Sequence, residues 1–182
     1  MSLNEYDGHW TTTYTGRKFH YLDPQPDEIC IEDIAHALAL TCRFGGHCKA
    51  FYSVADHSIR VAEILSPNLR LAGLLHDAHE AYLHDLLRPI KQDMPVYREL
   101  ADKIQHAIEE RLVSATQLQF IHHVSMYPVK CADNILLATE ARDLMANTEG
   151  WASLPAPLPC TIKPMTIRES ERDFLRCFDR WK

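Results

Sequence analysis

Histidine and acidic side chains are concentrated in one short apolar stretch, "GLLHDAHEAYLHDLLRPIK", at positions 73–91. His76 and Asp77 are adjacent, Glu80 follows three residues later, and His84 begins a second His-Asp pair. Burying such groups without partners is costly, whereas a divalent cation turns the same groups into a set of ligands. The stretch therefore predicts a site for a divalent metal ion.

One continuous helix is the element that we expect to carry this stretch. The pattern predicts that the helix begins at Ser66-Pro67, with proline in its first turn, and continues until Pro89 interrupts it. Side chains three, four and seven positions apart share a face of a helix, so His76, Glu80 and His84 would form one row. The row would present its imidazoles and carboxylate to the same metal site.

Two other predicted helices place metal-ligand types on apolar faces. In "SVADHSIRVAEIL", a helix expected to begin at Ser53, His57 lies on the core-facing side. In "YPVKCADNILLATEARDLM", within a helix expected at about 127–147, Asp133 lies among leucines. A single histidine such as His57 is usually a hydrogen-bonded core residue. Its combination with the His-Asp pair and Asp133 favours a shared cation.

The rest of the chain predicts a largely helical fold. "HWTTTYTGRKFHYL" alternates Thr and aromatic residues around a turn, which is typical of a small hairpin. No regular alternation follows it, so we expect the all-α class, with one domain over 1–182. Besides the helices above, the expected elements are the hairpin at about 9–22, helices at about 31–42, 93–113 and 167–181, and a Pro-rich connection at about 148–165.

Composition limits the classes of function. The net charge of −6 gives no general basic surface for a nucleic acid polymer. Apolar runs are too short to span a bilayer, and the N-terminus lacks the pattern of a signal peptide. The 6 cysteines form no C-x-x-C pair, and Cys42, His47 and Cys48 have no second pair to complete a zinc site. We therefore expect reduced thiols and a cytoplasmic protein.

The ordered set His57, His76-Asp77 and Asp133 resembles the HD-domain metal-dependent phosphohydrolases. "HDAHEAYLHDLLRPIK" is similar to the segment HD-x-x-E…D-x-x-x-P-x-K of the bacterial 5′-deoxynucleotidases. "IEDIAHALALTCRFGGH…FYSVADHS" resembles the start of small bacterial and phage phosphohydrolases, which include deoxynucleoside triphosphohydrolases. The resemblance covers about 15–145 and implies an HD-domain helical bundle.

The resemblance also implies roles for individual residues. One divalent cation, Mn, Co, Fe, Ni, Mg or Zn, would be bound by two imidazoles and two aspartates. A glutamate would do general acid–base work, with an aspartate as the second candidate for proton transfer. An arginine and a lysine would bind phosphate, and Phe44 stands where the deoxynucleotidases have Trp, which implies different selection of sugar or base. These residues are His57, His76, Asp77 and Asp133 for the metal, Glu80 and Asp85 for catalysis, and Arg43, Phe44 and Lys91 for the substrate.

Other roles for the same residues stay open at this point. Glu80 is also read as a solvated residue or an ion-pair partner of Arg88, and Arg43 and Lys91 as surface charges. His84 is a candidate to enter the site. A second metal would need further ligands from it or from His79, His122 and His123, which are otherwise surface or hydrogen-bonded residues.

The expected function is hydrolysis of nucleotide phosphate bonds, with deoxynucleotides as substrates and either a monophosphate or a triphosphate cleaved. One alternative is a (p)ppGpp or cyclic-nucleotide hydrolase, although Ala81 after Glu80 departs from the His-Asp-x-x-Glu-Asp of alarmone hydrolases. The other is a catalytically silent, metal-binding regulatory HD domain. A homo-oligomer, a dimer or larger, is also expected.

Overall fold

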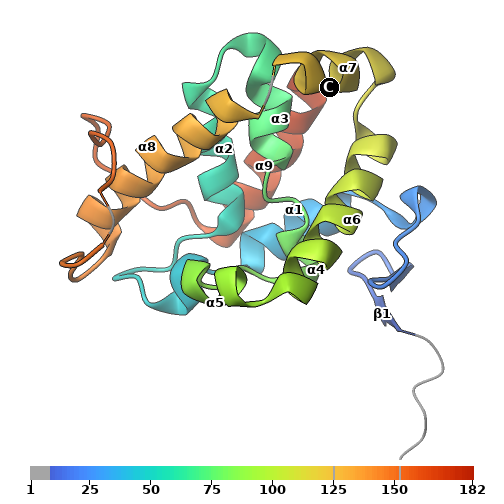
Figure 1. Cartoon of the computed structure of the whole chain (residues 1–182), viewed down its shortest axis with the longest axis horizontal. Helices are drawn as coiled ribbons and strands as arrows, with labels where there is room; N and C mark the ends of the chain where they lie inside the picture. Colours follow the sequence, from blue (N-terminus) through green and yellow to red (C-terminus); the bar gives the residue numbers. More distant parts are fainter. Residues whose placement is uncertain (1–8, 125, 152) are drawn as a thin grey trace, which may run out of the picture.

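The computed structural model describes residues 9–124, 126–151 and 153–182, without the side chains of 121–124. Helices pack around a common apolar core, and a two-stranded antiparallel hairpin lies at the N-terminal side of the molecule (Figure 1). The expected all-α class with a small N-terminal hairpin is confirmed. Within the described residues, no helix combines the length and apolar character needed to cross a bilayer.

The hairpin consists of β1 (Trp10–Thr12) and β2 (Lys18–His20). Gly16, at φ +84°, allows the tight turn between the strands, because only glycine adopts this region without a steric penalty. Phe19 of β2 is fully buried and stacks on Tyr82 with ring centroids 3.8 Å apart. One aromatic side chain therefore fastens the hairpin to the helical core.

The α-helices follow the hairpin in chain order, and a short 3-10 turn precedes each of the first three. Helices α1, α2, α6, α8 and α9 agree with the predicted positions to within a few residues at their ends. The turns are η1 (Pro26–Glu28), η2 (Arg43–Gly46) and η3 (Pro67–Leu69). The helices are α1 (Ile31–Leu40), α2 (Val54–Ile64), α3 (Arg70–Leu75), α4 (Glu80–Leu83), α5 (Arg88–Asp93), α6 (Pro95–Leu112), α7 (Ala115–Val124), α8 (Tyr127–Leu144) and α9 (Ile167–Trp181).

Helix α2 occupies the centre of the bundle and contacts α1, α3, α8 and α9 (Figure 1). Its first turn is capped as predicted, because the Ser53 hydroxyl accepts a hydrogen bond from the Asp56 backbone N–H at 3.1 Å. Eight of its 11 residues are buried, including the polar residues Asp56, His57 and Ser58. A polar group at this position must find its partners inside the protein.

The single helix predicted from Ser66 to Pro89 is wrong. Helix α3 ends at Leu75, a turn follows at 76–79, and α4 lasts only until Leu83. The Gly73 carbonyl accepts a hydrogen bond from the His76 ring at 2.7 Å, and such side-chain bonds compete with the helical ladder. His84 then adopts φ +62°, which ends α4. The predicted row of His76, Glu80 and His84 on one helical face does not exist.

Two helices were not predicted. Helix α5 begins at Arg88, so that Pro89 lies in its first turn rather than ending a helix. Helix α7 occupies a segment for which no element was predicted. Both additions are short, and α5 brings Arg88 and Lys91 to the site described next.

Candidate metal centre

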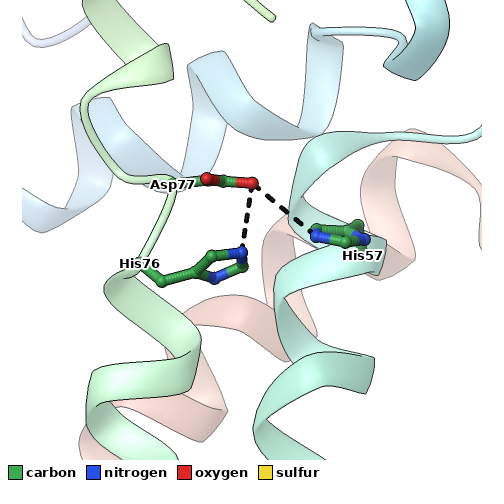
Figure 2. Close-up of side chains that lie close together, drawn as sticks. All are labelled: His57, His76 and Asp77. Carbon is green, nitrogen blue, oxygen red and sulfur yellow. Dashed lines mark ion pairs between the residues drawn. The ribbon is translucent and has the colours of Figure 1, made fainter. Parts of the chain in front are cut away.

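Three side chains from α2 and the end of α3 meet at one point (Figure 2). The Asp77 Oδ2 atom lies 3.1 Å from His76 Nε2 and 3.6 Å from His57 Nε2. One potential ligand atom from each residue lies within 4.8 Å of the other two. This separation suits three donors around one metal ion, so the group could hold a cation.

The second nitrogen of each imidazole is held by an acceptor. His57 Nδ1 lies 2.6 Å from Glu140 Oε1, and His76 Nδ1 lies 2.7 Å from the Gly73 carbonyl oxygen. A carbonyl can only accept, so His76 must donate from Nδ1, and a neutral ring then carries its lone pair on Nε2. Histidines that bind metals are oriented in this way.

Both Nε2 atoms are buried and lack a hydrogen-bond partner within the described part of the chain. The 3.1 Å approach of Asp77 to His76 Nε2 is too poorly aligned to serve as one. Buried polar groups without partners are uncommon in folded proteins. A cation placed among these atoms would give both imidazoles the partner that they lack, so the residues fit a metal ion.

Protonation shows how the centre balances charge without a metal. Burial and Arg43 oppose the charged form of His57, but Glu140 and Asp133 outweigh them and raise its pKa to about 9. Burial would raise the pKa of Asp77, but the neighbouring His76, His57 and Arg43 hold it well below its usual range. In the metal-free protein, the proton on His57 therefore offsets part of the negative charge of the neighbouring carboxylates, as a bound cation would.

Asp133 of α8 lies beside the three-residue group but is engaged elsewhere. Its Oδ1 is 3.5 Å from His57 Nε2, while its Oδ2 accepts a hydrogen bond from Lys130 Nζ at 2.8 Å and lies 3.9 Å from Arg88 Nη2. The structure therefore brings three of the four expected ligands together. It keeps the fourth in contact with His57 and paired with two cations.

Glu80, at the start of α4, is fully buried next to the centre. Its Oε1 forms an ion pair with Lys91 Nζ, and its Oε2 has no hydrogen-bond partner among the described residues. Burial, reinforced by Asp77 and Asp85, raises the Glu80 pKa to about 8, although Lys91 opposes the rise. Glu80 is therefore neither a solvated residue nor the partner of Arg88, and it can hold a proton near neutral pH.

Asp85 and Lys91 continue the network away from the metal centre. Lys91 Nζ lies 3.3 Å from Asp85 Oδ1, and Asp85 Oδ2 accepts the backbone N–H of Phe44 at 3.1 Å. Phe44 needs this support because it adopts φ +56°, which is rare for an L-residue with a bulky side chain. Its ring lies 6.3 Å from that of Trp151.

Arg43 of η2 is buried and is not a surface charge. Its guanidinium donates from Nη2 to Glu140 Oε2 at 3.1 Å, and its Nη1 lies 3.7 Å from Asp77 Oδ2. The Nε–H is buried and, within the described residues, has no acceptor. Arg43 therefore connects the acid that orients His57 with the carboxylate of the centre, and it keeps one donor unused.

None of the other histidines whose side chains the structure describes belongs to the three-residue group. His84 is exposed, adopts a positive φ at the end of α4 and lines the neighbouring cleft. His79 is partly buried, and its pKa is lowered by burial. The side chains of His122 and His123 lie outside the described residues.

Glu140 is the main residue that the sequence argument missed. It follows Asp133 by seven positions, which is close to two helical turns, so both carboxylates lie on the buried face of α8. That spacing was the available signal. Arg88 and Lys130, which face Asp133, carried no comparable signal because charged residues in such positions are normally solvated.

A cleft of about 750 Å³ borders the network at Asp85. It lies between the hairpin, α1 and the segment after α4. None of the described lining residues is a lysine or arginine. They are Thr11, Thr12, Thr13, Tyr14, Asp33, His36, Ala37, Leu40, Thr41, Cys42, Gly45, Ala81, Tyr82, His84 and Asp85.

Similarity to known proteins places the chain in a bacterial family. It is 39% identical over 149 residues to the uncharacterized protein YfdR of Escherichia coli K12, covering 82% of this chain and 80% of YfdR. It is 34% identical over 175 residues to the uncharacterized protein RCAP_rcc00048 of Rhodobacter capsulatus, covering 87% and 86% of the two chains. No family model matches. The chain belongs to the family that contains YfdR, and the names of these relatives assign it no activity.

Proposed function

We propose that the protein is a metal-dependent hydrolase of nucleotide phosphate bonds, built on an HD-type helical domain, with deoxynucleotides as substrates. The observation that carries the proposal is the meeting of two imidazole Nε2 atoms, those of His57 and His76, with the Asp77 carboxylate, where neither Nε2 has a hydrogen-bond partner among the described residues. A buried acid, Glu80, and a buried cation, Arg43, lie around this point. Metal ligands, a proton carrier and a phosphate-binding cation are the parts that such a reaction requires.

The donor set limits the choice of metal. Two imidazole nitrogens with carboxylate oxygens and no thiolate suit Mn, Co, Fe, Ni or Mg, and also a Zn ion with open coordination positions. Asp133 is the nearest further carboxylate, with Oδ1 3.5 Å from His57 Nε2. When bound, the cation would supply activation of a water molecule and would neutralise charge on phosphoryl oxygens.

The surrounding side chains would do the rest of the chemistry. Glu80, with its pKa raised to about 8, holds or releases a proton at neutral pH. Lys91 holds the Glu80 carboxylate in place through Oε1 and leaves Oε2 facing the interior. Arg43 offers its unused Nε–H to a phosphoryl oxygen, for which a guanidinium is well suited.

The neighbouring cleft supports a nucleotide rather than inorganic phosphate alone. Its volume, about 750 Å³, lies in the range of small-molecule sites. Its hydroxyl, imidazole and carboxylate lining, without a described cation, suits the uncharged sugar and base. Asp85 faces both the cleft and Lys91, so it would lie between the two parts of the substrate.

The test is a hydrolysis screen with ribo- and deoxynucleoside mono-, di- and triphosphates, each with Mn²⁺, Co²⁺, Ni²⁺, Mg²⁺ and Zn²⁺, and with products identified by mass. Elemental analysis of the same preparation reports bound metal. We expect metal-dependent release of phosphate or triphosphate from a deoxynucleotide, and its loss in Asp77→Ala. Bound metal with every nucleotide left intact would contradict the proposal and favour a regulatory metal-binding domain. Preferential cleavage of (p)ppGpp or a cyclic nucleotide would reassign the substrate.

A further inference from the structure

Two cations on different helices converge on the carboxylate next to the metal centre. Arg88 is at the start of α5, and Lys130 is in the first turn of α8. Their side-chain nitrogens lie 3.9 Å and 2.8 Å from the same atom, Asp133 Oδ2. Their side chains are 53% and 59% exposed, whereas that of Asp133 is 11% exposed. The pair therefore lies where the centre opens to solvent.

The inner cations of the network differ from this outer pair. Arg43 is 9% exposed and is bound to the buried Glu140. Lys91 is 27% exposed and is bound to the buried Glu80. Both are needed to neutralise carboxylates that have no access to water. The outer pair neutralises only Asp133, which is also the carboxylate nearest to His57 Nε2.

A charge count shows what a cation would change. Ion pairs connect five carboxylates, Asp77, Glu80, Asp85, Asp133 and Glu140, with four cations, Arg43, Arg88, Lys91 and Lys130. When both imidazoles are neutral, these charges sum to −1 with Glu80 ionised and to 0 with Glu80 protonated. A bound divalent cation makes the network net positive in either case, and it would compete with Arg88 and Lys130 for Asp133. The metal-bound centre would then attract an anion, and Arg88 and Lys130 would be available to bind it.

We propose that Arg88 and Lys130 bind the outer phosphate groups of the substrate, so that the site prefers nucleoside triphosphates to monophosphates. This inference rests on the proposed function and specifies the substrate class of the same site. A monophosphate has one phosphoryl group, which the centre and Arg43 would occupy. A triphosphate has two more, and the forked guanidinium of Arg88 and the point charge of Lys130 are complementary to them.

The alternative is that these are ordinary surface ion pairs, which contribute little to stability. Lys103 of α6 supplies a matched control, because it is 49% exposed and pairs with Glu99 at 2.9 Å. Lys103→Gln removes one positive charge, as each of the two substitutions of the test variant does, from a similarly exposed ion pair outside the network. The test variant is Arg88→Gln/Lys130→Gln, and thermal denaturation should show that both proteins fold as the wild type does.

The experiment measures binding by calorimetry with Mn²⁺ present, using a methylene-bridged deoxynucleoside triphosphate analogue and the matching monophosphate. We expect the wild-type protein to bind the triphosphate more tightly. The double variant should lose about tenfold or more of this affinity, as expected for two charge-assisted contacts, and less than about threefold for the monophosphate. The dependence of triphosphate affinity on salt should also become weaker. Lys103→Gln should leave the affinity for both the triphosphate and the monophosphate unchanged.

Failure of this inference is distinguishable from failure of the proposed function. If both nucleotides bind and Arg88→Gln/Lys130→Gln weakens them equally, or weakens neither, the assignment of the pair is wrong and the proposed function stands. If the wild type prefers the monophosphate, the inference is again wrong and the enzyme is a nucleotidase. If the wild type binds Mn²⁺ but neither nucleotide, both proposals are overturned.

Discussion

Replacement of Glu140 by glutamine is the most direct test of the metal centre. Glu140 is not itself an expected metal ligand, but its Oε1 lies 2.6 Å from His57 Nδ1 and its Oε2 accepts a hydrogen bond from Arg43 Nη2 at 3.1 Å. Burial alone would raise the Glu140 pKa, but Arg43 and His57 outweigh it and keep the pKa lowered, so the residue is a carboxylate. Glutamine keeps the shape and removes the charge that fixes the orientation of His57.

Two magnitudes follow from these contacts. Removing one partner of a buried ion pair costs about 3–5 kcal/mol, and we expect the lower end because Arg43 also lies 3.7 Å from Asp77. For a chain of this size, about 3 kcal/mol corresponds to a melting temperature lower by roughly 6–12 °C. Loss of the group that orients a metal-binding histidine weakens metal affinity by about 10–100-fold. That is about 1.4–2.7 kcal/mol of binding free energy.

The assay is competition for Mn²⁺ or Co²⁺ with a chromophoric chelator, accompanied by thermal denaturation of the metal-free protein. Glu171→Gln is the control, because Glu171 pairs with His36 Nδ1 at 3.3 Å in the same kind of contact, on α9 and away from the centre. We expect the control to keep wild-type metal affinity. A folded Glu140→Gln protein with wild-type metal affinity would show that His57 is a core histidine and not a ligand.

Further predictions concern the acids of the centre and pH. Asp77→Ala should abolish both bound metal, measured by elemental analysis, and turnover in the nucleotide screen; an active metal-free variant would reject the mechanism. Glu80→Gln should keep the metal and lower the rate by about 10²–10⁴-fold, and an unchanged rate would remove Glu80 from proton transfer. The folded pKa values of Glu80, about 8, and His57, about 9, exceed the ordinary values of about 4.3 and 6.5. The folded, metal-free protein therefore holds protons that the unfolded chain releases, and its melting temperature should fall as pH rises from about 6.5 to 8. A flat or rising melting temperature over that interval would contradict this reasoning. Metal affinity should increase over the same interval, because binding displaces the proton of His57.

The sequence was most informative where one local rule decides the structure. Ser53 caps α2, and α9 runs from Ile167 to Trp181 as predicted, because caps and apolar periodicity act within a few residues. His57 and Asp133 were also placed correctly on buried helical faces. In each case, the surroundings of the side chain depend mainly on its own helix.

The parts that sequence reasoning missed depend on contacts between elements. Arg43 is a charged residue in a loop, and only the buried Glu140 of α8 explains why it lies in the interior. Lys91 pairs with Glu80 because α5, which begins at Arg88, brings the Lys91 side chain back to the start of α4. The approach of Arg88 to Asp133 likewise joins two elements, because Arg88 begins α5 and Asp133 lies on α8. Helical periodicity contains no information about such partners.

The broken helix, which the sequence did not reveal, is what makes the His-Asp pair suitable for one ion. On a regular helix, neighbouring residues point about 100° apart, so His76 and Asp77 would diverge. Because α3 ends at Leu75, Asp77 is released from the helical direction, and its Oδ2 reaches within 3.1 Å of His76 Nε2. Gly73 contributes twice: its carbonyl orients His76, and a Cβ atom there would meet the Ala62 Cα at 3.0 Å. The close approach of α3 to α2 that this glycine permits is therefore what brings His76 to His57.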